Sequence, residues 1–249
     1  MTSALEWPVA ASLGVMGVIV GLFLGTVIER ELSDVSTFRT RPHCSAPTPG
    51  RSALVAALTG AVWVLVGLWS MSVDVPGVSP LLPIVLVVAS AGVALAFIDL
   101  GDHRLPDKIV LPLWPATTAG LALAGALSDD WPLRRALASS VLWILVIGGL
   151  WLVTGGRGMG FGDVKLAPVL GVVLGWIGWG PPLVGLAAAC LAGGLVSLVM
   201  IVAGRARRGQ SIPFGPFLIL GFMFGVLLGT SILEAYAAGI GIVNPPAQP

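Results

Sequence analysis

Long uncharged stretches dominate the pattern of apolar and polar positions along the chain. A helix that crosses the hydrocarbon core of a membrane needs ~20 mainly apolar residues, because each residue adds ~1.5 Å of length. Seven windows meet that need: residues 8–28, 53–73, 81–98, 109–127, 136–154, 183–203 and 214–233. An eighth window, 166–179, is shorter, but residues 166–204 hold no charge and are too many for one crossing. The pattern therefore predicts an all-α, polytopic membrane bundle of about eight transmembrane helices.

The positions of the basic residues predict the orientation of that bundle. Counted along the chain, the odd-numbered connections carry eleven of the 13 Lys and Arg, and the even-numbered ones carry only Arg134 and Arg135. Because Lys and Arg are enriched in cytoplasmic loops, both termini are expected outside. This arrangement needs an even number of spans, which supports the short window. We expect a single multi-pass domain, residues 1–249, in the cell's inner (cytoplasmic) membrane.

Composition narrows the class of protein further. Of the 249 residues, 56% are hydrophobic and 10% are charged, whereas soluble globular domains carry ~25% charged residues. An ordinary soluble enzyme, a disordered chain and a nucleic-acid-binding partner role are therefore excluded, and the lipid bilayer is the expected surrounding. Glycine is abundant, and the pairs Gly171 with Gly175 and Gly221 with Gly225 provide small faces for close helix packing.

Carboxylates are the most informative polar residues, because placing one near a membrane is costly. Most of the twelve lie in connections or near the termini. Asp99, however, ends the third span and Asp163 directly precedes the sixth, so the topology puts both at one end of the bundle. If the third and sixth helices are neighbours, the two acids can meet. Such a pair holds one proton, so one acid can activate a water while the other polarises a carbonyl.

Other chemistries have weaker support in the sequence. His43 and His103 show no metal-ligand spacing, and no Gly-x-Ser-x-Gly occurs. The glycine-rich run at 155–162 matches no nucleotide motif, so it is either a flexible linker or a place where a bound peptide passes close to the main chain. Two alternatives stay open: an ion-coupled transporter, although such sites lie near the bilayer midplane, and an inactive assembly subunit.

Three segments of the chain resemble those of a known family. Residues 98–107 read Ile-Asp-Leu-Gly-Asp-His-Arg-Leu-Pro-Asp, residues 160–166 read Gly-Phe-Gly-Asp-Val-Lys-Leu, and residues 212–218 read Ile-Pro-Phe-Gly-Pro-Phe-Leu. In this order they resemble segments of the type IV prepilin peptidases, or leader peptidases, which are membrane aspartic peptidases of the Gly-x-Gly-Asp type. Residues 21–30 are similar to the family's N-terminal segment, with Gly25 in place of its Asn.

The resemblance implies a membrane aspartic endopeptidase with Asp99 and Asp163 as its catalytic pair. Its expected substrates are type IV pilin-like or pseudopilin precursors, cut on the cytoplasmic side behind a basic leader peptide. The expected supporting residues are Gly160, Gly162, Asp107 and Lys165. Asp107 is expected to hold Arg104 or a loop backbone group, and Lys165 to bias the charge of the acid pair.

One family feature is missing from the connection at residues 29–52. Many members carry two Cys-x-x-Cys pairs there, whereas this chain keeps Cys44 alone, preceded by His43. One thiol and one imidazole cannot complete a tetrahedral zinc shell. This departure puts the metal, and with it methyl transfer from S-adenosylmethionine, in doubt. No cofactor is expected, and the oligomeric state is left open.

Overall fold

The part of the chain that the structure describes forms eight helices. The computed structural model describes residues 3–38, 49–72, 78–102, 105–128, 131–156, 159–203 and 213–240. In chain order, the helices are α1 (Ser3–Phe38), α2 (Pro49–Ser72), α3 (Val78–Asp102), α4 (Asp107–Ser128), α5 (Leu133–Val153), α6 (Phe161–Ile177), α7 (Gly180–Val202) and α8 (Gly215–Gly239). No strand occurs in these ranges. The predicted all-α class with eight helices is confirmed.

Seven of the eight helices are long and apolar enough to cross a membrane. The exception is α6, whose 17 residues give a length of ~26 Å, at the lower limit for a span. Each predicted window overlaps one helix, and most helices begin several residues before their window. The largest difference is at α1, which continues from residue 28 to Phe38, because the charged residues that end an apolar window are themselves good helix formers.

The turn between α6 and α7 is shorter than the run of Gly and Pro at 178–182 suggests. Only Gly178 and Trp179 separate the two helices. Pro181 and Pro182 already belong to α7, because the first turn of a helix has no intrahelical partner for its N–H groups and accepts proline readily.

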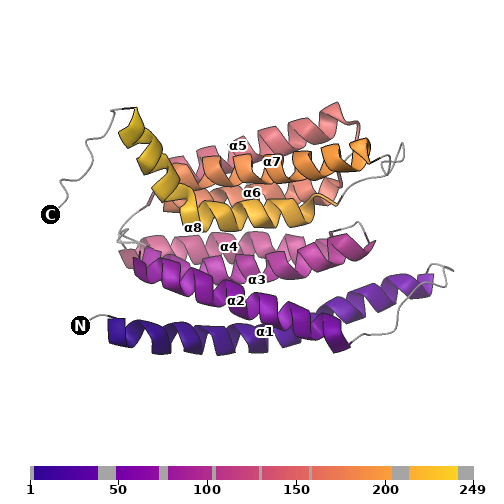
Figure 1. Ribbon diagram of the computed structural model, residues 1–249, viewed down its shortest axis with the longest axis horizontal. Helices are drawn as coiled ribbons and strands as arrows, with labels where there is room; N and C mark the ends of the chain where they lie inside the picture. Colours follow the sequence, from indigo (N-terminus) through magenta and orange to yellow (C-terminus); the bar gives the residue numbers. More distant parts are fainter. Residues whose placement is uncertain are drawn as a thin grey trace.

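The helices lie side by side, and successive helices run in opposite directions (Figure 1). The beginning of α1 and the end of α8 lie at the same end of the bundle, on the left in Figure 1, as an even number of passes requires. The other end is where α3 finishes and where α4, α6 and α8 begin, and we call it the acid end. Which end faces the cytoplasm stays a prediction.

The central helix of the bundle is α3, which contacts α1, α2, α4, α6 and α8. Close pairs form between α1 and α2, between α5 and α6, and between α7 and α8. Although α4 and α5 are consecutive, they do not contact each other, and each instead contacts α6. The main core includes the fully buried side chains of Trp143 on α5, Leu170 on α6 and Phe222 on α8.

Glycines make the closest helix contacts, as the sequence predicts. Gly171 and Gly175 of α6 face Ser139 of α5, and a Cβ at Gly171 would lie 2.8 Å from the carbonyl oxygen of that serine. Gly221 and Gly225 of α8 meet the backbone of α7 in the same way. Because lipid provides little hydrophobic drive for helices to associate, this close packing holds the pairs together.

Arg135 has a structural role at the end of α6. Its Nε and Nη2 donate hydrogen bonds of 2.6 Å each to the carbonyl oxygens of Gly175 and Trp176. The last carbonyls of a helix have no intrahelical donor, and a cation there also interacts favourably with the helix dipole. These hydrogen bonds explain why Arg135, a basic residue, occurs in an even-numbered connection, where few basic residues are expected.

Several residues singled out in the sequence lie outside the described ranges. They are His43, Cys44, His103, Arg104, Arg157 and the basic residues Arg205, Arg207 and Arg208.

Replacing Gly221 with valine should destabilise the bundle, because the new side chain would meet Ala189 at 2.7 Å from its Cβ. We expect a loss of about 1–3 kcal/mol, the usual cost of overpacking a tight interface, measured as a lower thermal unfolding temperature in detergent. Gly194→Val is the matched control, because a Cβ at Gly194 meets nothing within 4 Å. Equal unfolding temperatures for the two variants would contradict this account of the α7–α8 interface.

Candidate active site

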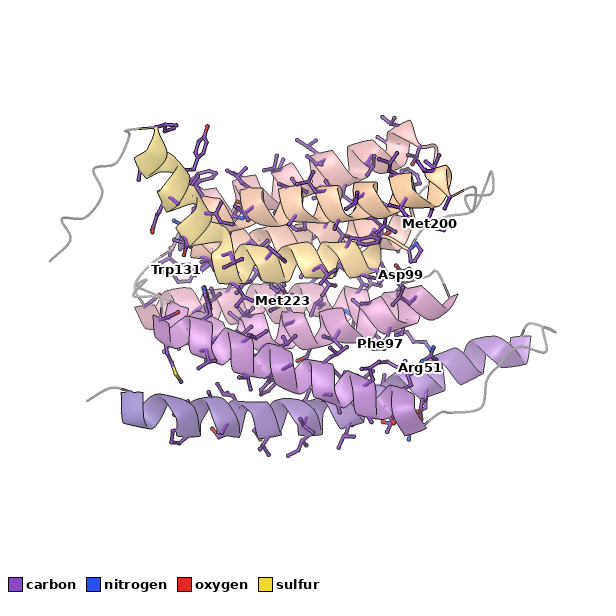
Figure 2. All side chains as sticks on the ribbon, in the orientation of Figure 1. Arg51, Phe97, Asp99, Trp131, Met200 and Met223 are labelled. Carbon is purple, nitrogen blue, oxygen red and sulfur yellow. The ribbon has the colours of Figure 1, made fainter. Side chains whose placement is uncertain are left out.

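Asp99 lies buried in the last turn of α3, at the acid end (Figure 2). Its carboxylate accepts a hydrogen bond at Oδ2 from the backbone N–H of Gly215, with a donor–acceptor distance of 3.0 Å. Gly215 is the first residue of α8, so this N–H has no acceptor within its own helix. The beginning of α8 therefore supplies a hydrogen bond and the positive end of a helix dipole to the carboxylate.

Gly215 is required by the close approach of α8 to this carboxylate. A Cβ at this position would lie 2.8 Å from Oδ2 of Asp99. Sequence reasoning connected the segment 212–218 with the family but missed that one of its N–H groups bonds to Asp99. The available signal was the Gly-Pro pair, because proline at Pro216 is typical of a helix that begins there.

Asp163 lies in the first turn of α6, before the continuous apolar part of that helix, and it is 1% exposed. Its Oδ1 has no hydrogen-bond partner among the described residues. Burial raises the pKa of Asp163 to about 8, the charge of Asp99 raises it as well, and the backbone hydrogen bond with Gly160 lowers it. Asp163 is therefore mainly protonated at neutral pH.

The structure brings these two acids to the same place. Helix α3 contacts α6, which meets the condition set by the sequence for the acids to approach each other. Both carboxyl groups are buried, and the Coulombic interaction with Asp99 contributes to the raised pKa of Asp163. Two carboxylates in such surroundings cannot both ionise cheaply, and the raised pKa of Asp163 favours its protonated form.

The two glycines before Asp163 differ in what surrounds them. Gly162 packs against the residue that leads into α4, since a Cβ on it would lie 2.6 Å from Cβ of Leu105. Gly160 is exposed, with an extended backbone at φ −73° and ψ 147°. A Cβ on Gly160 would meet only ordinary contacts, the nearest being Oδ2 of Asp163 at 3.7 Å. Free space therefore exists next to Asp163 at Gly160, whereas the side chain of Leu105 fills the space beside Gly162.

Asp107 and Lys165 form an ion pair with Nζ 2.7 Å from Oδ1. The same ammonium group lies 5.3 Å from the ring centre of Phe161, within reach of a cation–π interaction. The lysine therefore contacts Asp107 and Phe161. The predicted contact of Asp107 with Arg104 stays a prediction, because Arg104 lies outside the described residues. Because both side chains are partly exposed, the pair contributes at most about 1 kcal/mol, but it joins the beginning of α4 to that of α6.

The Phe161 ring also packs against Trp151 of α5, with ring centres 5.3 Å apart. The first turn of α6 is thus held from α4 on one side and from α5 on the other. Sequence reasoning did not single out Phe161, whose place between two motif glycines was the only signal.

The site as a whole is a convergence of helix ends. The last turn of α3 and the first turns of α4, α6 and α8 surround two buried acids. No group of three metal-ligating side chains occurs among the residues placed by the structure. Two buried acids that are held by helices, with free space at one neighbouring glycine, are suited to general acid–base catalysis on a polar group brought to them.

Comparison with known proteins identifies the family. Residues 86–198, which include both acids and all four supporting residues, match the model of the type IV leader peptidase family. No solved structure gives a significant match.

Curated relatives agree with this match. A protein of Aeromonas salmonicida named prepilin leader peptidase/N-methyltransferase is 34% identical over 202 residues, which is 79% of this chain and 65% of that protein. A protein of the same name from Aeromonas hydrophila is 35% identical over 198 residues, covering 78% and 63%. One from Pseudomonas aeruginosa is 33% identical over 147 residues, covering 57% and 48%. The chain thus spans less than two thirds of each relative's length. On the matched segment and on these relatives, the chain belongs to the type IV leader peptidase family.

Proposed function

We propose that this protein is a membrane aspartic endopeptidase that removes the leader peptide from type IV pilin-like or pseudopilin precursors. The observation that carries the proposal is the pair of buried acids, Asp99 and Asp163, inside the segment that matches the family. Relatives that share this segment are named prepilin leader peptidases. Seven helices able to cross a membrane make the protein a multi-pass membrane protein, and we assign it to the inner membrane.

The surroundings of the two acids suggest different roles. Asp99 accepts the N–H of Gly215, which stabilises its negative charge, so it acts as the base. Asp163 keeps its proton at neutral pH and has a carboxyl oxygen without a partner in the described part of the chain. It therefore donates its proton to the carbonyl oxygen of the peptide bond that is cut.

The reaction then proceeds in two proton-balanced steps. Asp99 removes a proton from a water, whose oxygen attacks the carbonyl carbon as Asp163 protonates the carbonyl oxygen, and a neutral tetrahedral diol forms. In the second step Asp99 gives its proton to the leaving nitrogen, the carbon–nitrogen bond breaks, and a diol hydroxyl returns its proton to Asp163. Both acids end in their starting protonation states, and no covalent intermediate or metal is needed.

We place the acid end in the cytoplasm. Arg51 lies at this end together with Asp99, whereas Trp131 lies at the opposite end (Figure 2). Lys108 and Lys165 belong to the first turns of α4 and α6 at the acid end. Because Lys and Arg favour the cytoplasmic side, this orientation puts the acids in the compartment where a basic leader peptide stays.

The supporting residues have distinct proposed roles. Gly160 leaves room for a substrate backbone beside Asp163, and Gly162 seats α6 against the segment that enters α4. The ion pair of Asp107 and Lys165 keeps the first turns of α4 and α6 together. We propose hydrolysis alone for this chain. We do not propose the N-methyltransferase activity that the relatives' name includes, because Cys44 is the only cysteine of the 29–52 connection.

Substituting Asn for Asp99 or for Asp163 should abolish cleavage of a prepilin in isolated membranes. Each variant is expected to lose about three orders of magnitude or more in kcat/KM, because the two acids act as one unit. Glu234→Gln, which changes an exposed acid in the last part of α8, should cleave normally. Substantial cleavage by both Asn variants would end the proposal, and ion flux through liposomes without cleavage would favour a transporter.

The cleavage rate should fall as the pH rises through about 8. Below that pH Asp163 is protonated and can donate to the carbonyl, and above it the acid ionises, so the rate should drop about tenfold for each further pH unit. The measurement is the pH profile of kcat/KM, with unfolding followed in parallel at each pH. A rate that stays constant up to pH 9.5 would contradict the role of Asp163 as the proton donor.

Replacing Gly215 with alanine should displace the Asp99 carboxylate, because the new Cβ would lie 2.8 Å from Oδ2. A displacement on the order of 1 Å costs about 10²-fold in rate, so we expect kcat to fall about 10- to 100-fold with little change in KM. Gly194→Ala, in open surroundings on α7, is the matched control. Equal kcat values for the two variants would show that Gly215 does not position Asp99.

A further inference from the structure

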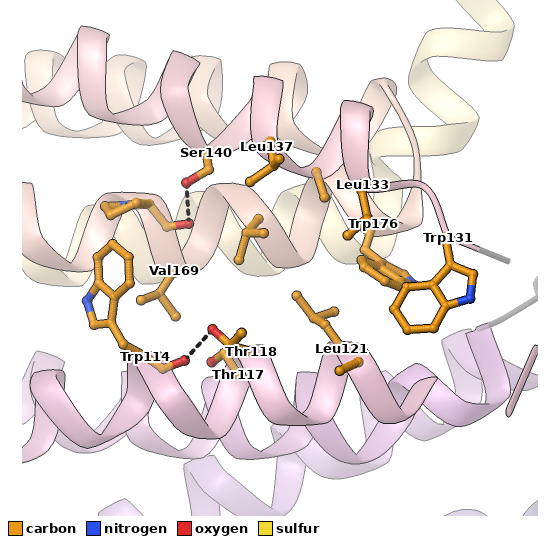
Figure 3. Close-up of a pocket in the computed structure, with 14 residues that line it drawn as sticks. Trp114, Thr117, Thr118, Leu121, Trp131, Leu133, Leu137, Ser140, Val169 and Trp176 are labelled. Carbon is orange, nitrogen blue, oxygen red and sulfur yellow. Dashed lines mark hydrogen bonds between the residues drawn. The ribbon is translucent and has the colours of Figure 1, made fainter. Parts of the chain in front are cut away.

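A groove separate from the acid pair lies between α4, α5 and α6 (Figure 3). Its volume is about 250 Å³. Large apolar side chains from all three helices form its walls, among them Trp114, Leu121, Leu137, Val169 and Trp176. Since α4 and α5 each contact α6 but not each other, the groove has α6 as its floor and opens between α4 and α5 towards the surrounding lipid.

The few hydroxyl groups in the wall are mostly engaged by the protein itself. Thr118 donates its hydroxyl to the carbonyl oxygen of Trp114 at 2.8 Å, and Ser140 donates to that of Pro168 at 3.1 Å. Thr117 is the exception, since its Oγ1 is buried and has no partner in the described residues. The remaining surface is apolar, so the groove suits a hydrocarbon chain better than a polar ligand.

The groove lies towards the end of the bundle opposite the acid end on two of its helices and reaches the middle of the third. It follows α5 over residues 133–140 and α6 over residues 168–176, and on α4 it covers residues 114–122 at the centre of that helix, a length of ~12 Å on α4 and on α6. One leaflet contributes ~15 Å of hydrocarbon. The groove ends at Trp131 and Trp176, whose rings meet edge to face at 6.4 Å, at the end of the bundle opposite the acid end. Tryptophan is typical of the membrane interface, so a molecule in the groove would have its outer end at headgroup level.

We propose that this groove binds one acyl chain of a glycerophospholipid from the leaflet opposite the acid end, with the lipid phosphate beside Arg134. Arg134 is exposed in the first turn of α5, next to the tryptophan end of the groove. A cation at headgroup level complements the phosphate, as an apolar wall complements the chain. A lipid phosphate at this position would also explain why Arg134 occurs in an even-numbered connection, where the distribution of Lys and Arg predicts few basic residues.

The size of the groove favours an acyl chain over a helix of another protein. An eight-residue stretch of helix, ~12 Å long and ~10 Å wide, occupies ~900 Å³, several times the volume of the groove. A helix from a partner or a second copy would therefore lie across the opening and leave the inside unfilled. An extended acyl chain enters between α4 and α5 and fills the space that remains because these two helices do not contact each other.

Bound lipid would also support the acid end. Helix α4 carries Asp107 and α6 carries Lys165 near their beginnings, and the same two helices both line the groove further along. A chain that fills the groove holds α4 and α6 at a constant spacing through the other half of the bundle.

The test is a titration of the purified full-length protein in detergent with phosphatidylglycerol, read by native mass spectrometry. One lipid should bind more tightly than the rest. Ala122→Phe and Val172→Phe narrow the groove from its α4 wall and from its α6 floor and should weaken that first binding event at least tenfold. Ala138→Phe, at an exposed position of α5 outside the groove, is the matched control and should bind the lipid normally.

The headgroup contact is tested at Arg134. Arg134→Gln should weaken binding about fivefold, the usual effect of one basic side chain at a lipid surface, and Arg134→Lys should restore it. Normal binding by both groove variants would overturn the proposal. So would decanoic acid competing as well as phosphatidylglycerol without dependence on Arg134, which would indicate a general hydrocarbon pocket. A dimer that Ala122→Phe abolishes and Ala138→Phe keeps would assign the groove to a second copy of the chain. Unfolding temperatures near that of the wild type establish that each variant is folded.

Discussion

The cost of placing two carboxyl groups in surroundings of low dielectric constant is the constraint on which the acid end depends. An unpaired charge there is expensive, and two adjacent negative charges are more so. The protein meets that cost in two ways. The N–H that begins α8 donates a hydrogen bond to Asp99, and burial raises the pKa of Asp163, which favours its protonated form. The chemical difference between two identical side chains thus arises from what each one faces.

The same constraint explains why helix ends, rather than helix middles, form the site. Free N–H groups and the positive end of the dipole occur only at the first turn of a helix. Three first turns, those of α4, α6 and α8, meet the last turn of α3. Such a meeting needs helices of suitable length and depth, and the short α6 is held by Arg135 at its other end. By fixing the far end of α6, Arg135 therefore helps to set the position of Asp163 along the bundle axis.

Close packing by glycine carries this arrangement through the membrane. Gly171 and Gly175 bring α6 against α5, and the glycines of α7 and α8 bring those two helices together. Where such contacts are absent, between α4 and α5, a groove is left that faces the lipid. The tight interfaces fix the packing of α6 against α5 and of α8 against α7, whereas α4 and α5 leave an open groove between them.

Local patterns in the sequence were enough to predict the number of helices and their approximate limits and to single out the two acids, because these depend on uncharged length, the positions of Lys and Arg, and an acid at the edge of an apolar run. Asp107 and Lys165 were predicted through motifs, but not as partners of each other. That pairing, the hydrogen bond from Gly215 to Asp99, the contacts of Phe161 and the gap between α4 and α5 became visible only in the folded bundle. Each of these joins residues that are distant along the chain, and their geometry follows from how the helices pack, which no local pattern encodes.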